Sequence, residues 1–72
     1  MPIMDLELSE TLRMLRMRKG LTLRDMEAIS GVDHATISRM ENGKGEISFQ
    51  KLQRLAKALG VTIGALCGEM PL

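Results

Sequence analysis

The sequence predicts an all-α domain made of five short helices. Two features indicate this fold. Apolar residues recur at spacings of three and four, which is the period of a helix that buries one face. Residue types that favour helix N-termini precede these segments, and a glycine follows each of them. The predicted helices span residues 9–19, 23–30, 33–42 (counting its cap at 33), 49–59 and 63–67.

The first predicted helix begins at Ser9, a residue type that caps helix N-termini, and ends before Gly20. Basic residues crowd its C-terminal half, where positive charge interacts favourably with the helix dipole. Residues 1–8 show no clear element, and we expect an arm that is either a frayed terminus or a contact with a partner subunit. A single folded domain is expected to cover residues 9–67, followed by a tail at 68–72.

The second and third predicted helices form a pair hinged at Gly31, a residue that tolerates the left-handed backbone at a helix end. Thr22 is expected to cap the first of the pair, and Asp25 completes a capping-box-like arrangement three residues later. Val32 is expected to fill the turn, and Asp33 to cap the next helix. The apolar residues expected to face the core from this pair are Met26, Ile29, Ile37 and Met40.

The outer face of the helix at 34–42 has an unusual composition. At about 100° per residue, one arc of roughly 140° holds small and hydrogen-bonding residues. They are His34, Ala35, Ser38, Arg39 and Asn42. An ordinary solvated face mixes glutamate and lysine, so we expect this face to approach another surface closely. A helix of this width fits the major groove of B-DNA.

The fourth predicted helix is capped by Ser48 and carries a stripe of basic residues, Lys51, Arg54 and Lys57, that is typical of a solvated face. Its side toward the core is expected to consist of Phe49, Leu52, Leu55, Ala56 and Leu59. Thr62 can cap the fifth helix.

The end of the chain leaves an apolar surface once the core is complete, and we expect this surface to form a dimer interface. Its members are Ile63, Leu66, Cys67, Met70 and Leu72. Cys67 is interpreted as a small buried hydrophobe, with a redox switch as the alternative.

The composition excludes several classes of protein. Phe49 is the single aromatic residue, which argues against recognition of single strands by base stacking, and the net charge is only +1. No apolar run is long enough to span a bilayer, and the acidic N-terminus lacks the features of a signal peptide, so we expect a cytoplasmic protein. One histidine and one cysteine lie far apart in sequence, and no glycine-rich phosphate loop is present. We therefore expect no metal, no cofactor and no enzymatic activity.

A series of motifs runs in order from Leu8 to Leu66. The motifs are Leu12-x-x-Leu15-Arg16, Gly20-Leu21-Thr22, Gly31-Val32, the run from Ala35 to Lys44, Ser48-Phe49, and Leu52-x-x-Leu55 with the run from Ala56 to Val61. Together they resemble a helix-turn-helix domain of the lambda-repressor/Cro type, also called the xenobiotic-response-element (XRE) family. The resemblance covers most of the chain and implies a five-helix lambda-repressor-like DNA-binding domain.

The resemblance also implies roles for individual residues. Arg16 is expected to pair with Glu41, which would tie the first helix to the helix at 33–42. Leu23 stands where glutamine is frequent in the family, and Glu27 stands where a small alanine usually lets the two helices pack closely. A glutamate at that position must lie along the edge or extend outward. The residues expected to contact DNA phosphates are Arg24, Thr36, Asn42, Lys44 and Lys51.

Met14 and Met17 stand where the family commonly has charged residues. They form either a methionine patch for a partner or a flexible filling at the edge of the core. Contact of this helix with a membrane surface is disfavoured, because the helix is short and its apolar side is needed inside.

We predict a sequence-specific DNA-binding transcriptional regulator, a repressor, acting as a homodimer with the helix at 33–42 in the major groove of double-stranded DNA. The expected base contacts come from His34, Ala35, Ser38 and Arg39. The alternatives are a protein-interaction module that keeps the fold, favoured by the near-neutral charge, and an antitoxin that also binds a toxin. The chain has no room for an effector domain, so regulation is expected from concentration, dimerisation or a second regulatory protein.

Overall fold

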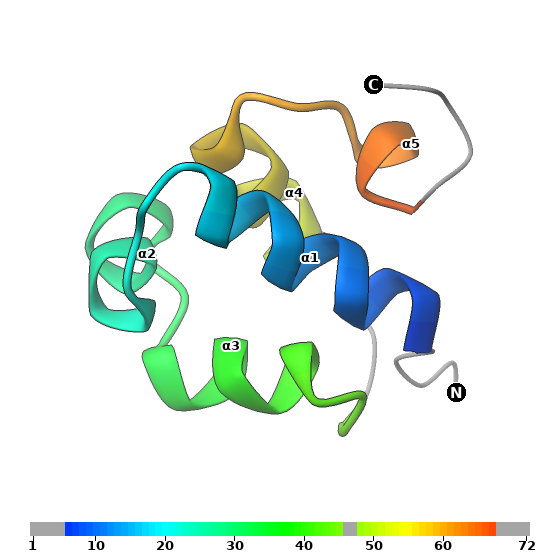
Figure 1. Ribbon diagram of the computed structural model, residues 1–72, viewed down its shortest axis with the longest axis horizontal. Coiled ribbons are helices and arrows are strands. Elements are labelled where there is room, and N and C mark those ends of the chain that lie inside the picture. Colours follow the sequence, from blue (N-terminus) through cyan, green and yellow to red (C-terminus); the bar gives the residue numbers. More distant parts are fainter. Residues whose placement is uncertain (1–5, 46–47, 68–72) are drawn as a thin grey trace.

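The structure is a computed structural model, and it describes residues 6–45 and 48–67. These residues form five α-helices and no β-strand, so the predicted all-α fold class is confirmed. The helices are α1 (Leu6–Arg18), α2 (Leu23–Ser30), α3 (His34–Glu41), α4 (Phe49–Leu59) and α5 (Ile63–Leu66). In Figure 1, α1 crosses the middle of the molecule, α2 and α3 lie on one side of it, and α4 lies behind.

A single apolar core joins all five helices. Its fully buried members come from every helix, and they are Leu12, Met26, Ile37, Leu55, Leu59 and Leu66. Burying a side chain of this size contributes about 1.5–3 kcal/mol to stability. Because Ile37 and Met40 of α3 belong to this core, the inward face of α3 is fixed and its opposite face is turned away from the other helices.

The first helix starts earlier than predicted. It begins at Leu6, so Ser9 is not its N-cap but an interior residue with no exposed surface. The reason is that Leu8 is itself a core residue at 4% exposure, and a helix that begins before it places its side chain in the core. The first part of the expected arm, residues 1–5, lies outside the described residues.

The capping arrangement predicted for α2 is present. The hydroxyl of Thr22 accepts a hydrogen bond from the amide of Asp25 at 3.0 Å, and the carboxylate of Asp25 accepts one from the amide of Thr22 at 2.9 Å. Gly31 ends the helix in the left-handed region at φ 77°, and Val32 is buried in the turn that follows. The sharp change of direction between α2 and α3 is therefore encoded by adjacent residues.

Two predicted core residues are exposed instead. Ile29 is 55% exposed, because a spacing of three residues rotates it about 60° away from the direction of the buried Met26. Phe49 is 63% exposed, because it is the first residue of α4 and stands one turn ahead of Leu52, the first buried residue of that helix. The rest of the predicted inner side of α4 is buried as expected.

The last two helices keep their predicted caps. The hydroxyl of Ser48 accepts a hydrogen bond from the amide of Lys51, and the hydroxyl of Thr62 accepts one from the amide of Ala65. Helix α5 ends at Leu66, one residue sooner than expected, with Cys67 as its C-cap. None of the helices in the described part of the chain has the length and apolar character needed to cross a bilayer.

Candidate nucleic-acid interface

Helix α3 lies along one edge of the molecule, and none of the other helices in the described residues covers its far side (Figure 1). Its N-terminus is capped by Asp33, whose Oδ2 accepts hydrogen bonds from the amides of Ala35 at 3.0 Å and Thr36 at 3.3 Å. The negative charge of this carboxylate is therefore used by the helix itself. The sequence rule that predicted an outward face on α3 matches the observed packing, because Ile37 and Met40 are buried on the opposite side.

The residues predicted to contact bases share the outer side of α3. Ala35 and Arg39 are exposed, whereas His34 and Ser38 are half-buried. The guanidinium of Arg39 lies beside Gly45 in the loop after α3. A methyl group in place of the Gly45 hydrogen would be in van der Waals contact with Nη2 of Arg39, at 3.8 Å. Small side chains thus occupy the middle of the face, and the one long cation of the set lies toward its C-terminal end.

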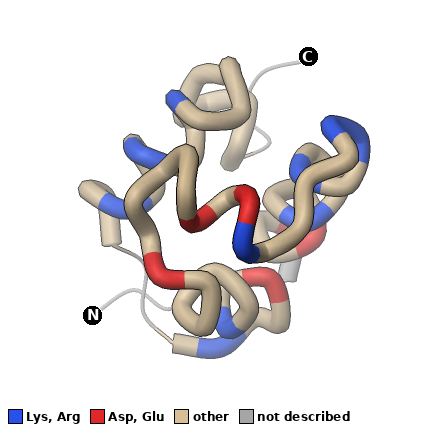
Figure 2. Tube along the Cα trace, turned by 90° about the vertical axis from the view of Figure 1, so that its left-hand side faces the viewer, with Lys and Arg blue, Asp and Glu red and all other residues tan. Residues whose placement is uncertain are grey.

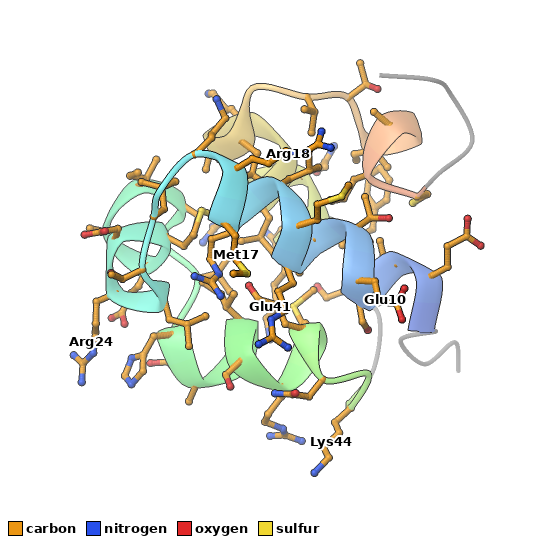
Figure 3. The ribbon with its side chains drawn as sticks, viewed as in Figure 1. Glu10, Met17, Arg18, Arg24, Glu41 and Lys44 are labelled. Atoms are coloured by element: carbon orange, nitrogen blue, oxygen red, sulfur yellow. The ribbon has the colours of Figure 1, made fainter. Side chains whose placement is uncertain are left out.

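The residues predicted to contact phosphates come from three helices and a loop. Arg24 and Lys44 are exposed and extend from opposite ends of the same edge, so they flank α3 (Figure 3). Asn42 is exposed, and its side-chain Nδ2 donates a hydrogen bond to the backbone carbonyl of Ser38 at 2.7 Å. Lys51 belongs to the first turn of α4, a helix that lies behind the others in Figure 1, and Thr36 is half-buried. Only Arg24 and Lys44 are thus brought to this edge as a clear pair.

Basic and acidic residues are mixed along the described chain. Figure 2 shows them interspersed along the Cα trace. The formal net charge of +1 agrees with this picture. Attraction to a polyanion must therefore come from a few placed cations rather than from the overall charge.

The C-terminal end of α3 is tied to α1 by the ion pair that the resemblance implied. The Nε of Arg16 lies 2.7 Å from one carboxylate oxygen of Glu41, and its Nη2 lies 3.0 Å from the other. The remaining Nη1 donates to the carbonyl of Leu21 at 2.7 Å. The side chains are only 13% and 5% exposed, and the hydrogen bond to Glu41 raises the pKa of Arg16. In Figure 3, Glu41 points from α3 toward α1.

The N-terminal end of α3 is tied to α2 by a contact that the sequence analysis missed. Oε1 of Glu27 accepts a hydrogen bond from the amide of His34 at 3.1 Å and lies 2.6 Å from Nδ1 of its ring. The side-chain hydrogen bond from His34, followed by the backbone one, lowers the pKa of Glu27. The sequence signal was the unusual glutamate itself, which was expected only to avoid the helix contact.

Glu27, Asp33 and His34 place their donor atoms within 4.8 Å of one another. Both carboxylates, however, already accept hydrogen bonds from amides at the start of α3. The positive end of the helix dipole at this position also disfavours a bound cation. We therefore assign the three groups to capping of α3. Glu27 is the closer acidic neighbour of His34, because its Oε1 lies 2.6 Å from Nδ1 of the ring and Oδ1 of Asp33 lies 3.8 Å away.

The apolar surface predicted for dimerisation is partly inside the subunit. Leu66 is fully buried in its own core, because α5 closes that core, and it is therefore not available to a partner. Ile63 and Cys67 are half-buried and pack against the same core. Met70 and Leu72 lie outside the described residues.

A different apolar surface lies on α1. Met14 and Met17 are 40% and 59% exposed, so they do not fill the core edge. They line a shallow hollow of about 460 Å³ whose other walls are Glu10, Arg13 and Arg18. Of the two interpretations of these methionines, exposure favours the surface patch.

A family model for helix-turn-helix domains, HTH_3, matches residues 12–66, which is most of the chain and includes the core of α1 through α5. The chain belongs to the HTH_3 family. It therefore has the DNA-binding helix-turn-helix fold of transcriptional regulators, as the XRE-type resemblance implied.

Individual relatives agree with this membership. The chain is 34% identical over 58 residues to the HTH-type transcriptional regulator DdrOP3 of Deinococcus deserti, a match that covers 81% of this chain and 45% of that protein. The chain thus spans about half the length of that relative.

Solved structures of two regulators superpose closely. The restriction-modification controller protein C.AhdI of Aeromonas hydrophila is 30% identical, with a TM-score of 0.81 over 85% of this chain and 92% of that one. The clp gene regulator ClgR of Corynebacterium glutamicum is 32% identical, with a TM-score of 0.83 over 94% of this chain and 72% of that one.

Proposed function

We propose that this protein is a sequence-specific repressor that binds duplex DNA as a homodimer, with α3 of each subunit in the major groove. The observation that supports this function best is the uncovered outer face of α3 between two cations, Arg24 and Lys44 (Figure 3). A face of small and hydrogen-bonding side chains can approach base edges, while the flanking cations can reach phosphates on either side. The protein would act by occupying DNA, without catalysis.

The proposed base contacts follow from side-chain chemistry. Arg39 is suited to the O6 and N7 acceptors of guanine, and Ala35 to the methyl group of thymine. His34 and Ser38 offer further hydrogen-bonding groups on the same face. The proposed phosphate contacts are Arg24, Thr36, Asn42, Lys44 and Lys51.

Dimerisation would place two α3 helices about one DNA turn, or roughly 34 Å, apart in successive major grooves. The residues that remain candidates for the dimer face are Ile63, Cys67, Met70 and Leu72. A chain of 72 residues has a small core, and burial of this face in a dimer would add stability. Removal of residues 67–72 followed by mass measurement in solution is expected to convert a dimer into a monomer.

The proposal is tested by selecting binding sites from a random duplex library and measuring affinity for the selected duplex by fluorescence anisotropy. Arg39→Ala is expected to cost about 1–3 kcal/mol of binding to the selected duplex and to relax one position in each half-site. Lys44→Ala is the matched control, because loss of a phosphate contact weakens binding to selected and random duplexes alike. Equal losses on both duplexes for Arg39→Ala contradict a base-reading role.

A second candidate is a module that binds another protein through this fold, including an antitoxin that binds a toxin. The exposed Met14 and Met17 favour it, because methionines adapt to varied partner surfaces. If a second protein regulates the DNA-binding protein, the surface formed by Met14 and Met17 is also a candidate site for it. A protein-interaction module without DNA binding would show no duplex selection and no salt-dependent retardation of DNA fragments, which separates it from the regulator.

A further inference from the structure

We propose that Glu27 determines what His34 reads on DNA, by holding the imidazole with Nδ1 as the donor and leaving Nε2 as the outward-facing atom. This inference rests on the proposed DNA-binding function and adds a positioning residue to it. Glu27 does not belong to the outer face of α3; it acts from α2, across the turn at Gly31.

The geometry fixes the ring through a single oxygen. Oε1 of Glu27 lies 2.6 Å from Nδ1 of His34 and 3.1 Å from the amide nitrogen of the same residue. An ionised carboxylate can only accept hydrogen bonds, so a bond this short requires the proton on Nδ1. The lowered pKa of Glu27 means that its carboxylate is ionised at neutral pH. The backbone contact fixes the position of the carboxylate, and the ring contact fixes the rotation of the imidazole.

The charged groups around the ring leave its other edge accessible. From α3 itself, Oδ1 of Asp33 stands 3.8 Å from Nδ1, too far for a second hydrogen bond. From α2, Arg24 extends toward the same end of α3, and from α1, Arg16 pairs with Glu41 at the opposite end (Figure 3). The side chain of His34 is 34% exposed, and Nε2 is the ring nitrogen that the contact with Glu27 leaves for a ligand in this proposal.

The tautomer decides which base edge Nε2 can recognise. In the neutral ring with hydrogen on Nδ1, Nε2 is an acceptor. In the major groove it then matches the amino donor of adenine or cytosine. When the ring is protonated, Nε2 becomes a donor and matches the acceptors of guanine or the O4 of thymine. With its proton held on Nδ1, the ring should therefore select adenine or cytosine at one position in each half-site.

The first test needs no DNA. His34 is the only histidine in the chain, so its ring nitrogens give unambiguous signals in ¹⁵N-resolved NMR spectra. At pH 8, the wild-type ring is expected to carry its proton on Nδ1. Glu27→Gln should keep this tautomer, because the amide oxygen still accepts, and Glu27→Ala should lose it. Glu10→Gln on α1 removes a charge far from the turn and is the matched control (Figure 3). A wild-type ring protonated on Nε2 instead, or an unchanged tautomer in Glu27→Ala, overturns the inference.

The second test uses duplexes selected from a random library at pH 8, in buffers with EDTA so that no metal links Glu27, Asp33 and His34. The position at which His34→Ala loses base selectivity should be adenine or cytosine in the sequences that the wild-type protein selects. At that position, Glu27→Ala should reduce discrimination about fivefold, the value of one hydrogen bond, and leave other positions unchanged. Glu27→Gln should retain the preference seen at pH 8.

The outcomes separate this inference from the proposed function. A wild-type protein that selects a sequence with no position dependent on His34 or Glu27 overturns the inference and leaves the DNA-binding function standing. A protein that selects no sequence overturns both. Melting curves followed by circular dichroism establish that each variant is folded, and Glu27→Gln preserves the acceptor for α3 even where Glu27→Ala weakens the helix start.

Discussion

The substitution Arg16→Met tests how much of the stability of this small domain depends on one ion pair. Methionine keeps the apolar stem of the arginine but removes its guanidinium. Three hydrogen bonds are lost, two to Glu41 and one to the carbonyl of Leu21. The carboxylate of Glu41, which is 5% exposed, is left without a charged partner in an apolar environment.

Removal of one partner from a buried ion pair costs about 3–5 kcal/mol, and the 13% exposure of Arg16 favours the lower end. A domain of 72 residues has a total stability of about 4–11 kcal/mol, estimated at about 0.05–0.15 kcal/mol per residue. A loss of about 3 kcal/mol corresponds to a fall in Tm of about 12–24 °C for a domain of this size. Arg16→Met should therefore remove a large fraction of the stability.

The assay is urea denaturation followed by far-ultraviolet circular dichroism, at fixed protein concentration. Arg13→Met, one turn earlier on the same helix and exposed, is the matched control and should change stability by less than about 0.5 kcal/mol. The double variant Arg16→Met with Glu41→Leu should recover most of the loss, because apolar replacement of a whole buried pair is often neutral or stabilising. If Arg16→Met is as stable as Arg13→Met, or if the double variant is no better than the single one, the buried-charge reasoning is refuted.

Three further predictions concern local features. Gly31→Ala should lower stability by about 1–2 kcal/mol in the same denaturation assay, because φ 77° is a left-handed conformation that alanine adopts at a cost. Asp25 and Glu27 have pKa values lowered by their hydrogen bonds to Thr22 and His34, from ordinary values of 3.8 and 4.5. Their stabilising contribution is present above those ordinary values and is lost as the pH falls through the lower folded-state values. Melting temperatures measured from pH 6 to pH 2 should therefore fall on acidification, and less steeply in Glu27→Gln than in wild type. Phe49→Ser should change the free energy of unfolding by less than about 0.5 kcal/mol, because Phe49 is 63% exposed. A large loss of stability in the melting curve would show that the ring is buried in solution.

Local rules predicted most helix ends well, with the start of α1 as the exception, because each of those ends depends on neighbours in the chain. The capping box of Thr22 and Asp25, the cap of Asp33 and the left-handed Gly31 all lie within a few residues of the groups that they satisfy. Periodicity was also sufficient to separate the two faces of α3, because a helix with Ile37 and Met40 inward must turn its other side out.

Predictions failed where tertiary packing sets the limits of the core. The apolar period gives the direction of a side chain but not the point at which neighbouring helices stop covering it. Ile29 and Phe49 lie beyond that point, and Leu66 lies within it. The hydrogen bonds from His34 to Glu27 join residues seven positions apart across a turn, so neither helical spacing nor a cap rule anticipates them.

The residues that attach α3 to the neighbouring helices differ from most of the residues proposed to read DNA. Its first turn is bonded to Glu27 and its last turn to Arg16, through contacts made by His34 and Glu41. The side chains of positions 35 and 39 are exposed and are not needed for these attachments. Under the proposed function, new DNA sequence preferences can evolve at those positions without remodelling the scaffold, whereas any change at His34 also alters an attachment point.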